Sequence, residues 1–109
     1  MSGIAESEFE KVADDELRRL VEALDELGDE IDPELQRGVL SILFEDGTKF
    51  VVNSHRAARQ IWMAADRRAW HFDYRDGRWL TASDEAELWS SLGEVLTAKL
   101  GTEVSLETP

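Results

Sequence analysis

Cysteine is absent from the chain, so disulfides, thiolate metal sites and thiol catalysis are excluded. No stretch approaches the roughly 20 apolar residues of a membrane-spanning helix, and the first residues have the features of neither a signal peptide nor an Arg-rich transit sequence. There are only two histidines, no Gly-rich phosphate loop and no nucleophile at a recognisable spacing from a base. We therefore expect a cytoplasmic binding protein of 109 residues, folded as one domain, and not an enzyme.

Basic residues are scarce in the first third of the chain. Residues 1–34 hold 13 acidic and three basic residues, whereas the other 75 hold 11 and nine, within a total net charge of -12. An acidic segment of this kind argues against binding to nucleic-acid phosphates. It favours cations or basic protein surfaces as partners.

The acidic segment is predicted to form an amphipathic helix over about residues 7–27. Ser7 and Glu10 have the spacing of a capping box, and Gly28 is expected to end the helix. The opposite side of the helix is acidic, and Lys11 and Arg18 dilute only its first half. Apolar residues recur at helical spacing along one side: Phe9, Ala13, Leu17, Leu20, Leu24 and Leu27.

Four carboxylates near the end of this helix, Glu22, Asp25, Glu26 and Asp29, share one surface. They repel one another and oppose the helix dipole, so they reduce the stability of the fold. Carboxylates without histidine or cysteine suit hard cations such as iron, manganese or calcium. Because exposed carboxylates on a helix cannot enclose an ion, we expect modest affinity and poor selectivity. The alternative, which holds for most acidic helices, is a solvated surface without a ligand.

Five strands are predicted over residues 35–44, 49–53, 60–64, 70–74 and 78–81. The turn signal Asp46-Gly47 is expected to lie in a three-residue loop with Gly47 left-handed, which would pair Phe44 with Phe50.

A second helix is predicted over about residues 84–100, with Ser83 or Thr81 as its cap and Gly101 at its end. Residues 102–106 form either a short final strand or a tail between the helices. The order of helix, antiparallel strands and helix predicts an α+β fold, a two-layer sandwich with both helices on one face of the sheet.

The hairpin over residues 60–74 gives the most informative register. If Asp66-Arg67 is its turn, Trp62 lies opposite His71 and shares with Gln60 the face that points to water. A large exposed aromatic side chain is informative because it indicates a binding surface. The alternative, a slip of one residue, would bury Trp62 but turn Met63 and its apolar neighbours outward.

From the residues alone, neither histidine has a special role. His55 is predicted in the loop before the hairpin, and His71 on its water-facing side, both as ordinary surface side chains. Ferroxidase chemistry at clustered carboxylates would need a preorganised site, and exposed acids do not provide one.

The sequence is similar to the frataxin family, and more closely to its bacterial, CyaY-type members, over nearly the whole chain. The residues that carry this resemblance are Gly38-Val39-Leu40, Asn53, Gln60-Ile61-Trp62-Met63-Ala64 and the segment from His71 to Trp79, together with the acidic first helix. The resemblance implies one domain over residues 1–109, built in the order of one helix, five or six strands and a second helix.

What the resemblance implies for function is an iron-binding protein of iron–sulfur cluster assembly. It would act as a regulator, iron donor or iron sensor of the complex between a cysteine desulfurase and its scaffold protein. Iron, as Fe²⁺ or Fe³⁺, would bind weakly along an acidic ridge, as would other divalent cations. Carried onto this chain, the ridge falls on Glu8, Glu10, Asp14, Glu22, Asp25, Glu26, Asp29, Glu30 and Asp32. The sheet face that contacts the complex falls on Asn53, Gln60, Trp62 and His71.

The resemblance further implies a monomer that metal can assemble into an oligomer, no nucleic-acid or membrane partner, and at most weak ferroxidase activity. In this chain Lys11, Arg18 and Arg19 interrupt the ridge, so its first half is expected to bind less. The alternative function is an acidic interaction module that competes for a basic partner surface and binds cations only incidentally.

Overall fold

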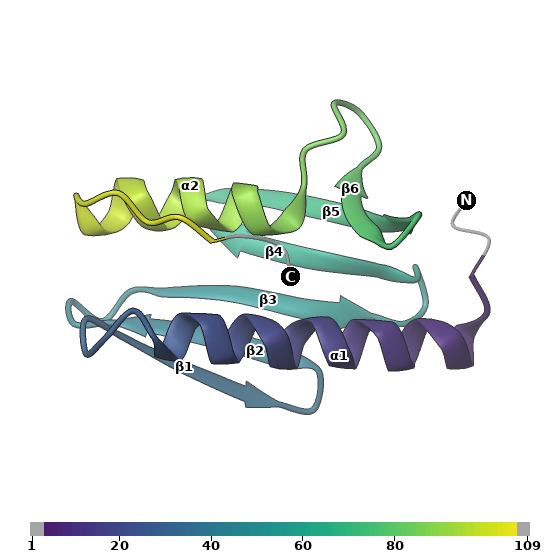
Figure 1. Ribbon diagram of the computed structural model, residues 1–109, viewed down its shortest axis with the longest axis horizontal. Helices are drawn as coiled ribbons and strands as arrows, with labels where there is room; N and C mark the ends of the chain where they lie inside the picture. Colours follow the sequence, from purple (N-terminus) through teal and green to yellow (C-terminus); the bar gives the residue numbers. More distant parts are fainter. Residues whose placement is uncertain (1–3, 107–109) are drawn as a thin grey trace.

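Two helices lie on one face of a six-stranded antiparallel sheet in the computed structural model, which describes residues 4–106 (Figure 1). Each strand pairs with the next along the chain, so the predicted α+β sandwich is confirmed. The ends of the predicted domain, residues 1–3 and 107–109, lie outside the described residues. No helix in the described range is long and apolar enough to cross a membrane. The elements are α1 (Glu6–Asp25), β1 (Ile31–Gln36), β2 (Val39–Phe44), β3 (Lys49–His55), β4 (Gln60–Ala65), β5 (Arg68–Arg75), β6 (Arg78–Thr81) and α2 (Leu88–Leu100).

The hydrophobic core lies between the helices and the sheet face that they cover. Along α1 the predicted apolar side is buried, and Phe9 and Leu17 have no exposed surface. The strands contribute alternate residues such as Ile42 and Ile61, and α2 contributes Leu92. Removing one fully buried leucine side chain typically costs about 2–5 kcal/mol. This layer therefore fixes both helices against the sheet and leaves the other sheet face, which we name the open face, uncovered.

The start of α1 differs from the prediction. The helix begins at Glu6, with Ala5 in the capping position and no side-chain cap, so the predicted Ser7 cap is wrong. A capping residue has an extended backbone, and Ser7 is already inside the first helical turn. At the other end the helix stops at Asp25, and Gly28 has the left-handed conformation (φ 96°) that redirects the chain toward the sheet.

A tight turn that the sequence did not reveal separates β1 from β2. The prediction of a single strand over residues 35–44 is wrong, because Arg37 and Gly38 both have positive φ (51° and 78°) and close a two-residue hairpin. A Cβ on Gly38 would lie 2.6 Å from Ser54 Oγ, so only glycine fits without movement. β1 is an edge strand, which is where Pro33 can be accommodated.

The predicted three-residue loop between β2 and β3 is present, with Gly47 left-handed (φ 90°). The predicted pairing is wrong by two residues, because Ile42, and not Phe44, lies opposite Phe50. Since side chains alternate between the two faces, a shift of two leaves the same residues in the core. Phe44 and Phe50 become diagonal neighbours, with ring centroids 4.7 Å apart.

The hairpin of β4 and β5 has the predicted register. Asp66 and Arg67 have positive φ (52° and 64°) and form its turn, and Trp62 lies opposite His71. Met63 is buried under the helices, so Trp62, next to it in β4, points to the open face.

The second helix begins later than predicted. Glu85 has a positive φ (54°), which interrupts any helix through residues 84–87, and the first helical residue is Leu88. The predicted caps, Ser83 and Thr81, are wrong, because the residue that caps α2 is Glu87. Its carboxylate accepts hydrogen bonds from two backbone N–H groups of the first turn. The acidic run at residues 84–87 therefore forms a loop and a cap in place of the expected first turn.

The end of α2 agrees with the prediction, since Gly101 is left-handed (φ 74°) and closes the helix. Residues 102–106 form no strand and run back along α2 on the side that faces α1, so the expected tail is the correct alternative (Figure 1). The Val104 N–H donates to the Thr97 hydroxyl over 2.9 Å and ties the tail to the helix.

Candidate functional site

Exposed carboxylates gather where α1 ends, in a group that we name the acidic end: Glu22, Asp25, Glu26, Asp29 and Glu30. The last turn of α1 contains no basic residue. Within the described residues none of these five carboxylates forms an ion pair. Because the helix dipole also places partial negative charge at this end, the acidic end is a surface of uncompensated negative charge.

The acidic end is an open surface and not a preformed metal cage. Among residues 4–106, no three Asp, Glu or His side chains are placed so that they could hold one metal ion. A hard cation such as Mg²⁺ is commonly bound through one or two carboxylates and keeps water in its remaining positions. The chemistry of these donors therefore fits a weakly held, exchangeable cation.

In the first half of α1, arginines pair three carboxylates, and Glu10 is the predicted ridge residue among them. Arg56, in the turn after β3, lies 2.7 Å from Glu10 and 3.9 Å from Glu6. This contact raises the pKa of the Arg56 guanidinium, chiefly through the hydrogen bond to Glu10. Arg18 lies 2.5 Å from Asp15 one turn along the helix. These carboxylates are occupied, so this half of α1 has less free charge for a cation.

The remaining predicted ridge residues are scattered. Glu8 and Asp14 are exposed on the first half of α1, away from the acidic end. Asp32 follows the buried Ile31 in β1, so its side chain points to the open face, on the other side of the sheet from α1. Five of the predicted residues thus follow one another closely around the end of α1, whereas Asp32 faces the other side of the sheet.

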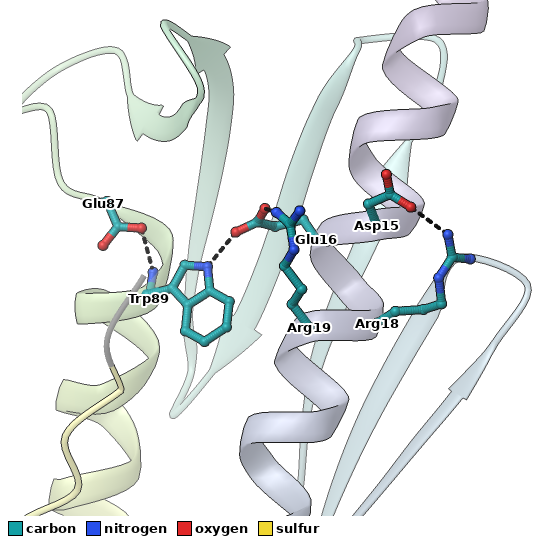
Figure 2. Close-up of polar contacts among 6 residues, drawn as sticks. All are labelled: Asp15, Glu16, Arg18, Arg19, Glu87 and Trp89. Atoms are coloured by element: carbon teal, nitrogen blue, oxygen red, sulfur yellow. Dashed lines mark hydrogen bonds and ion pairs between the residues drawn. The ribbon is translucent and has the colours of Figure 1, made fainter. Parts of the chain in front are cut away.

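One acidic residue of α1 has a structural task that the sequence did not show. Glu16 is 7% exposed, and its carboxylate accepts a hydrogen bond from the indole N–H of Trp89 in α2 (Figure 2). Arg19 lies 3.5 Å from the same carboxylate. The Trp89 backbone N–H donates to Glu87, the cap of α2, over 3.0 Å. Glu16 therefore joins the two helices and is not available as a cation ligand.

On the open face, three rings from neighbouring strands stack on one another. The Trp62 ring lies 3.9 Å from the His55 ring and 4.2 Å from the His71 ring, with interplanar angles of 15° and 14°. We name these three side chains the ring stack. The indole N–H of Trp62 donates to Gln60 Oε1 over 2.8 Å, and Gln60 Nε2 donates to Asp73 over 2.9 Å. The stack is therefore an ordered feature of the surface, with Trp62 half-buried between two imidazoles.

His55 is the functional candidate that the sequence prediction missed. The prediction placed it in a loop, but β3 extends to His55, and its side chain faces the same way as Asn53. The Ala58 N–H donates to His55 Nδ1 over 3.3 Å and fixes the ring against the following turn. The signal was present as the alternation of Asn53 and His55, which continues the pattern of β3 beyond its predicted end.

Apolar side chains lie beside the ring stack on the open face, together with the charged Asp73, which accepts a hydrogen bond from Gln60. Val39, Asn53, Trp62 and His71 lie side by side across four strands. Two large apolar side chains of β2 are exposed on this face, Val39 at 41% and Leu43 at 43%. From β2 to β5 the next row across the sheet holds small or β-branched residues: Ser41, Val51, Ala64 and Ala69. In β1 the same row ends at Glu34, which lies opposite Ser41. An exposed apolar area with an ordered aromatic side chain is typical of a protein-docking surface.

One family model and several solved structures match this chain. The family model described as frataxin-like domain matches residues 2–102. A solved frataxin from Psychromonas ingrahamii is 25% identical, with a TM-score of 0.87 over 96% of this chain and 100% of that one. Yeast frataxin is 26% identical, with a TM-score of 0.72 over 87% of this chain and 82% of that one. A trimeric frataxin from Saccharomyces cerevisiae, complexed with ferrous iron, is 28% identical, with a TM-score of 0.65 over 85% of both chains.

Proposed function

The chain belongs to the frataxin-like domain family, and from this membership and its two surfaces we propose that it binds iron and acts in iron–sulfur cluster assembly. In this proposal the protein regulates a cysteine desulfurase–scaffold complex, to which it brings or reports iron. The acidic end holds the iron as cargo, and the open face contacts the complex. The role is one of binding, without a catalytic step of its own.

The iron part of the proposal is supported by the family and by donor chemistry. A yeast relative forms a complex with ferrous iron, and carboxylates are the ligands that hard cations prefer. Glu22 in α1 and Glu26, the residue that caps its end, are one helical turn apart and exposed, so one hydrated ion can contact both. Because the surface is open, the ion exchanges readily, as cargo must.

The observation that carries the docking part is the ring stack on an uncovered sheet face. Tryptophan is enriched among the residues that dominate binding energy at interfaces, and truncating such an anchor can cost 2 kcal/mol or more. Trp62 is already ordered by Gln60 and by both histidines. Asn53, beside it across the sheet, adds an amide that can hydrogen-bond a partner backbone in either direction.

An anaerobic titration with Fe²⁺, combined with a desulfurase assay, tests both parts. The protein should change desulfurase activity in the presence of the scaffold, and the change should depend on iron. The Glu22→Gln/Glu26→Gln variant should bind iron more weakly but still dock. Trp62→Ala should bind iron normally and lose affinity for the complex by roughly thirty-fold or more. If either variant lost both properties while still folded, the assignment of two separate surfaces would be wrong.

A second candidate function is an acidic interaction module that competes for a basic partner surface. It is favoured by the open geometry of the acidic end, where no three carboxylates or histidines of residues 4–106 surround a common metal position. An identical effect on the desulfurase with and without iron would select this candidate.

A further inference from the structure

His55 lies where a strand ends, and strand ends are positions from which a side chain can turn into solvent. Its ring instead covers one face of Trp62 as closely as His71 covers the other. In the sheet His55 lies opposite Gln60, two residues before Trp62, so the contact is diagonal. Diagonal neighbours in a sheet lie within reach of aromatic side chains. Trp62 is therefore clamped from both sides by residues of two different strands.

Two of the three rings, those of His55 and Trp62, are each held by a further hydrogen bond. The Ala58 N–H donates to His55 Nδ1 over 3.3 Å, and the Trp62 indole N–H donates to Gln60 over 2.8 Å. Gln60 in turn donates to Asp73 on β5 over 2.9 Å. The orientation of the indole is thus determined by the turn after β3 at one side and by β5 at the other.

We propose that His55 is a positioning residue for docking, which together with His71 fixes the Trp62 ring in one orientation before the partner binds. The proposal rests on the docking function proposed for the open face. An exposed tryptophan has several rotamers available, and freezing one side chain on binding reduces affinity by about two- to tenfold. In this protein the ring is already ordered in the free state, so that loss is avoided.

The clamp also determines what kind of partner surface fits. Both faces of the indole are covered, and its N–H is already used by Gln60. A partner ring or guanidinium cannot stack on Trp62 without displacing an imidazole. The partner therefore contacts the edges of the ring stack and the small side chains beside it, and inserts no ring or guanidinium against the indole.

The test is a set of affinities for an immobilised desulfurase–scaffold complex. His55→Ala should bind the complex about fivefold more weakly than the parent. This value lies within the about two- to tenfold loss of affinity expected when one side chain is ordered on binding. His55→Phe keeps a ring that can stack and should bind nearly as the parent does. In the Trp62→Ala background, His55→Ala should have no further effect, because His55 acts through Trp62. His55→Gln, which is polar and cannot stack, should match His55→Ala and replaces it if the alanine variant does not fold.

An independent readout is the Trp62 indole resonance in NMR spectra of the free protein. Its nuclear Overhauser contacts to the His71 ring should weaken in His55→Ala and persist in His55→Phe, while the melting temperatures of the two variants stay close.

Three results would overturn the proposal or the docking function on which it rests, and the measured affinities distinguish them from one another. Normal binding by His55→Ala, alongside weak binding by Trp62→Ala, overturns the positioning role and leaves the docking function standing. Normal binding by Trp62→Ala overturns the docking function itself. An equal loss from His55→Ala with and without Trp62 means that His55 contacts the partner directly, which also overturns the positioning role.

Discussion

Replacing Glu16 with alanine should lower the free energy of unfolding by about 1–3 kcal/mol, the usual penalty for leaving a buried polar group without its partner. The group left unpaired is the Trp89 indole N–H, which donates to the Glu16 carboxylate across the gap between α1 and α2 (Figure 2). Trp89 is 2% exposed and Glu16 is 7% exposed, so water has little access to replace the lost acceptor. For a chain of 109 residues, each 1 kcal/mol corresponds to about 4 °C. The melting temperature should therefore fall by about 4–12 °C.

The assay is urea unfolding followed by circular dichroism, arranged as a double-mutant cycle with Trp89→Phe. Trp89→Phe removes the donor, so Glu16→Ala should cost less in that background, with a coupling of about 1 kcal/mol or more. Asp15→Ala is the matched control: Asp15 is the adjacent residue, but it pairs with Arg18 on the exposed side of α1 and should change stability by less than about 0.5 kcal/mol. An equal cost of Glu16→Ala with and without the Trp89 indole would refute the reasoning.

Three further outcomes follow from the structure. Glu22→Gln/Glu26→Gln should raise the melting temperature at low salt, because each like-charge pair at this spacing costs a few tenths of a kcal/mol. The increase should become smaller at high salt, which screens the repulsion. A lower melting temperature would mean that these carboxylates are structurally paired. Lys99 and then Thr48 hydrogen-bond Asp46 and hold its pKa well below the ordinary value. The stabilising contribution of Asp46 is therefore present above its unfolded-state pKa of about 4 and is lost as the pH falls toward its folded-state pKa. Asp46→Asn should accordingly make the unfolding free energy, measured in urea, less sensitive to acid below about pH 5, and an unchanged acid dependence would contradict this. Gly38→Ala should lower the free energy of unfolding by about 1–3 kcal/mol, since the residue has a positive φ of 78° and the new Cβ would lie 2.6 Å from Ser54 Oγ. Ser54→Ala in the same chain should recover part of the lost stability. If it recovers none, the strain lies in the backbone alone.

The parts of the fold that could be predicted are those in which local pattern and tertiary structure agree. The hairpin at Trp62 has clear alternation on both strands and a short turn between them, so its register follows from burying one face. The hairpin at Arg37 lacks that signal, because arginine is not a residue that marks a left-handed turn. The late start of α2 depends on the left-handed Glu85, which occupies a run of acids that otherwise favours a first helical turn.

The candidate site shows the same limit at the level of side chains. Sequence spacing identifies the carboxylates of α1 but not which of them are already engaged. Glu10 is paired by Arg56, which is 46 residues away, and Glu16 is bonded by Trp89, which is 73 residues away. His55 was overlooked for a related reason, since its importance comes from a ring on the neighbouring strand. The contacts of Glu10 and Glu16 arise only when distant elements pack together, so no local pattern encodes them. For His55, the local alternation indicates the longer strand but not the ring that it meets.

The two proposed surfaces lie on opposite sides of the sheet, and this arrangement has a consequence for how they act together. The acidic end belongs to the helix layer, at the C-terminal end of α1 (Figure 1). The ring stack lies on the open face near the other end of α1, where Arg56, the residue after His55, reaches Glu10. In the proposed function, a partner seated on the ring stack would leave the acidic end in contact with solvent, where cations would exchange while the protein is docked. Under that proposal, iron binding at the acidic end and docking through the ring stack should be nearly independent for a single protein molecule.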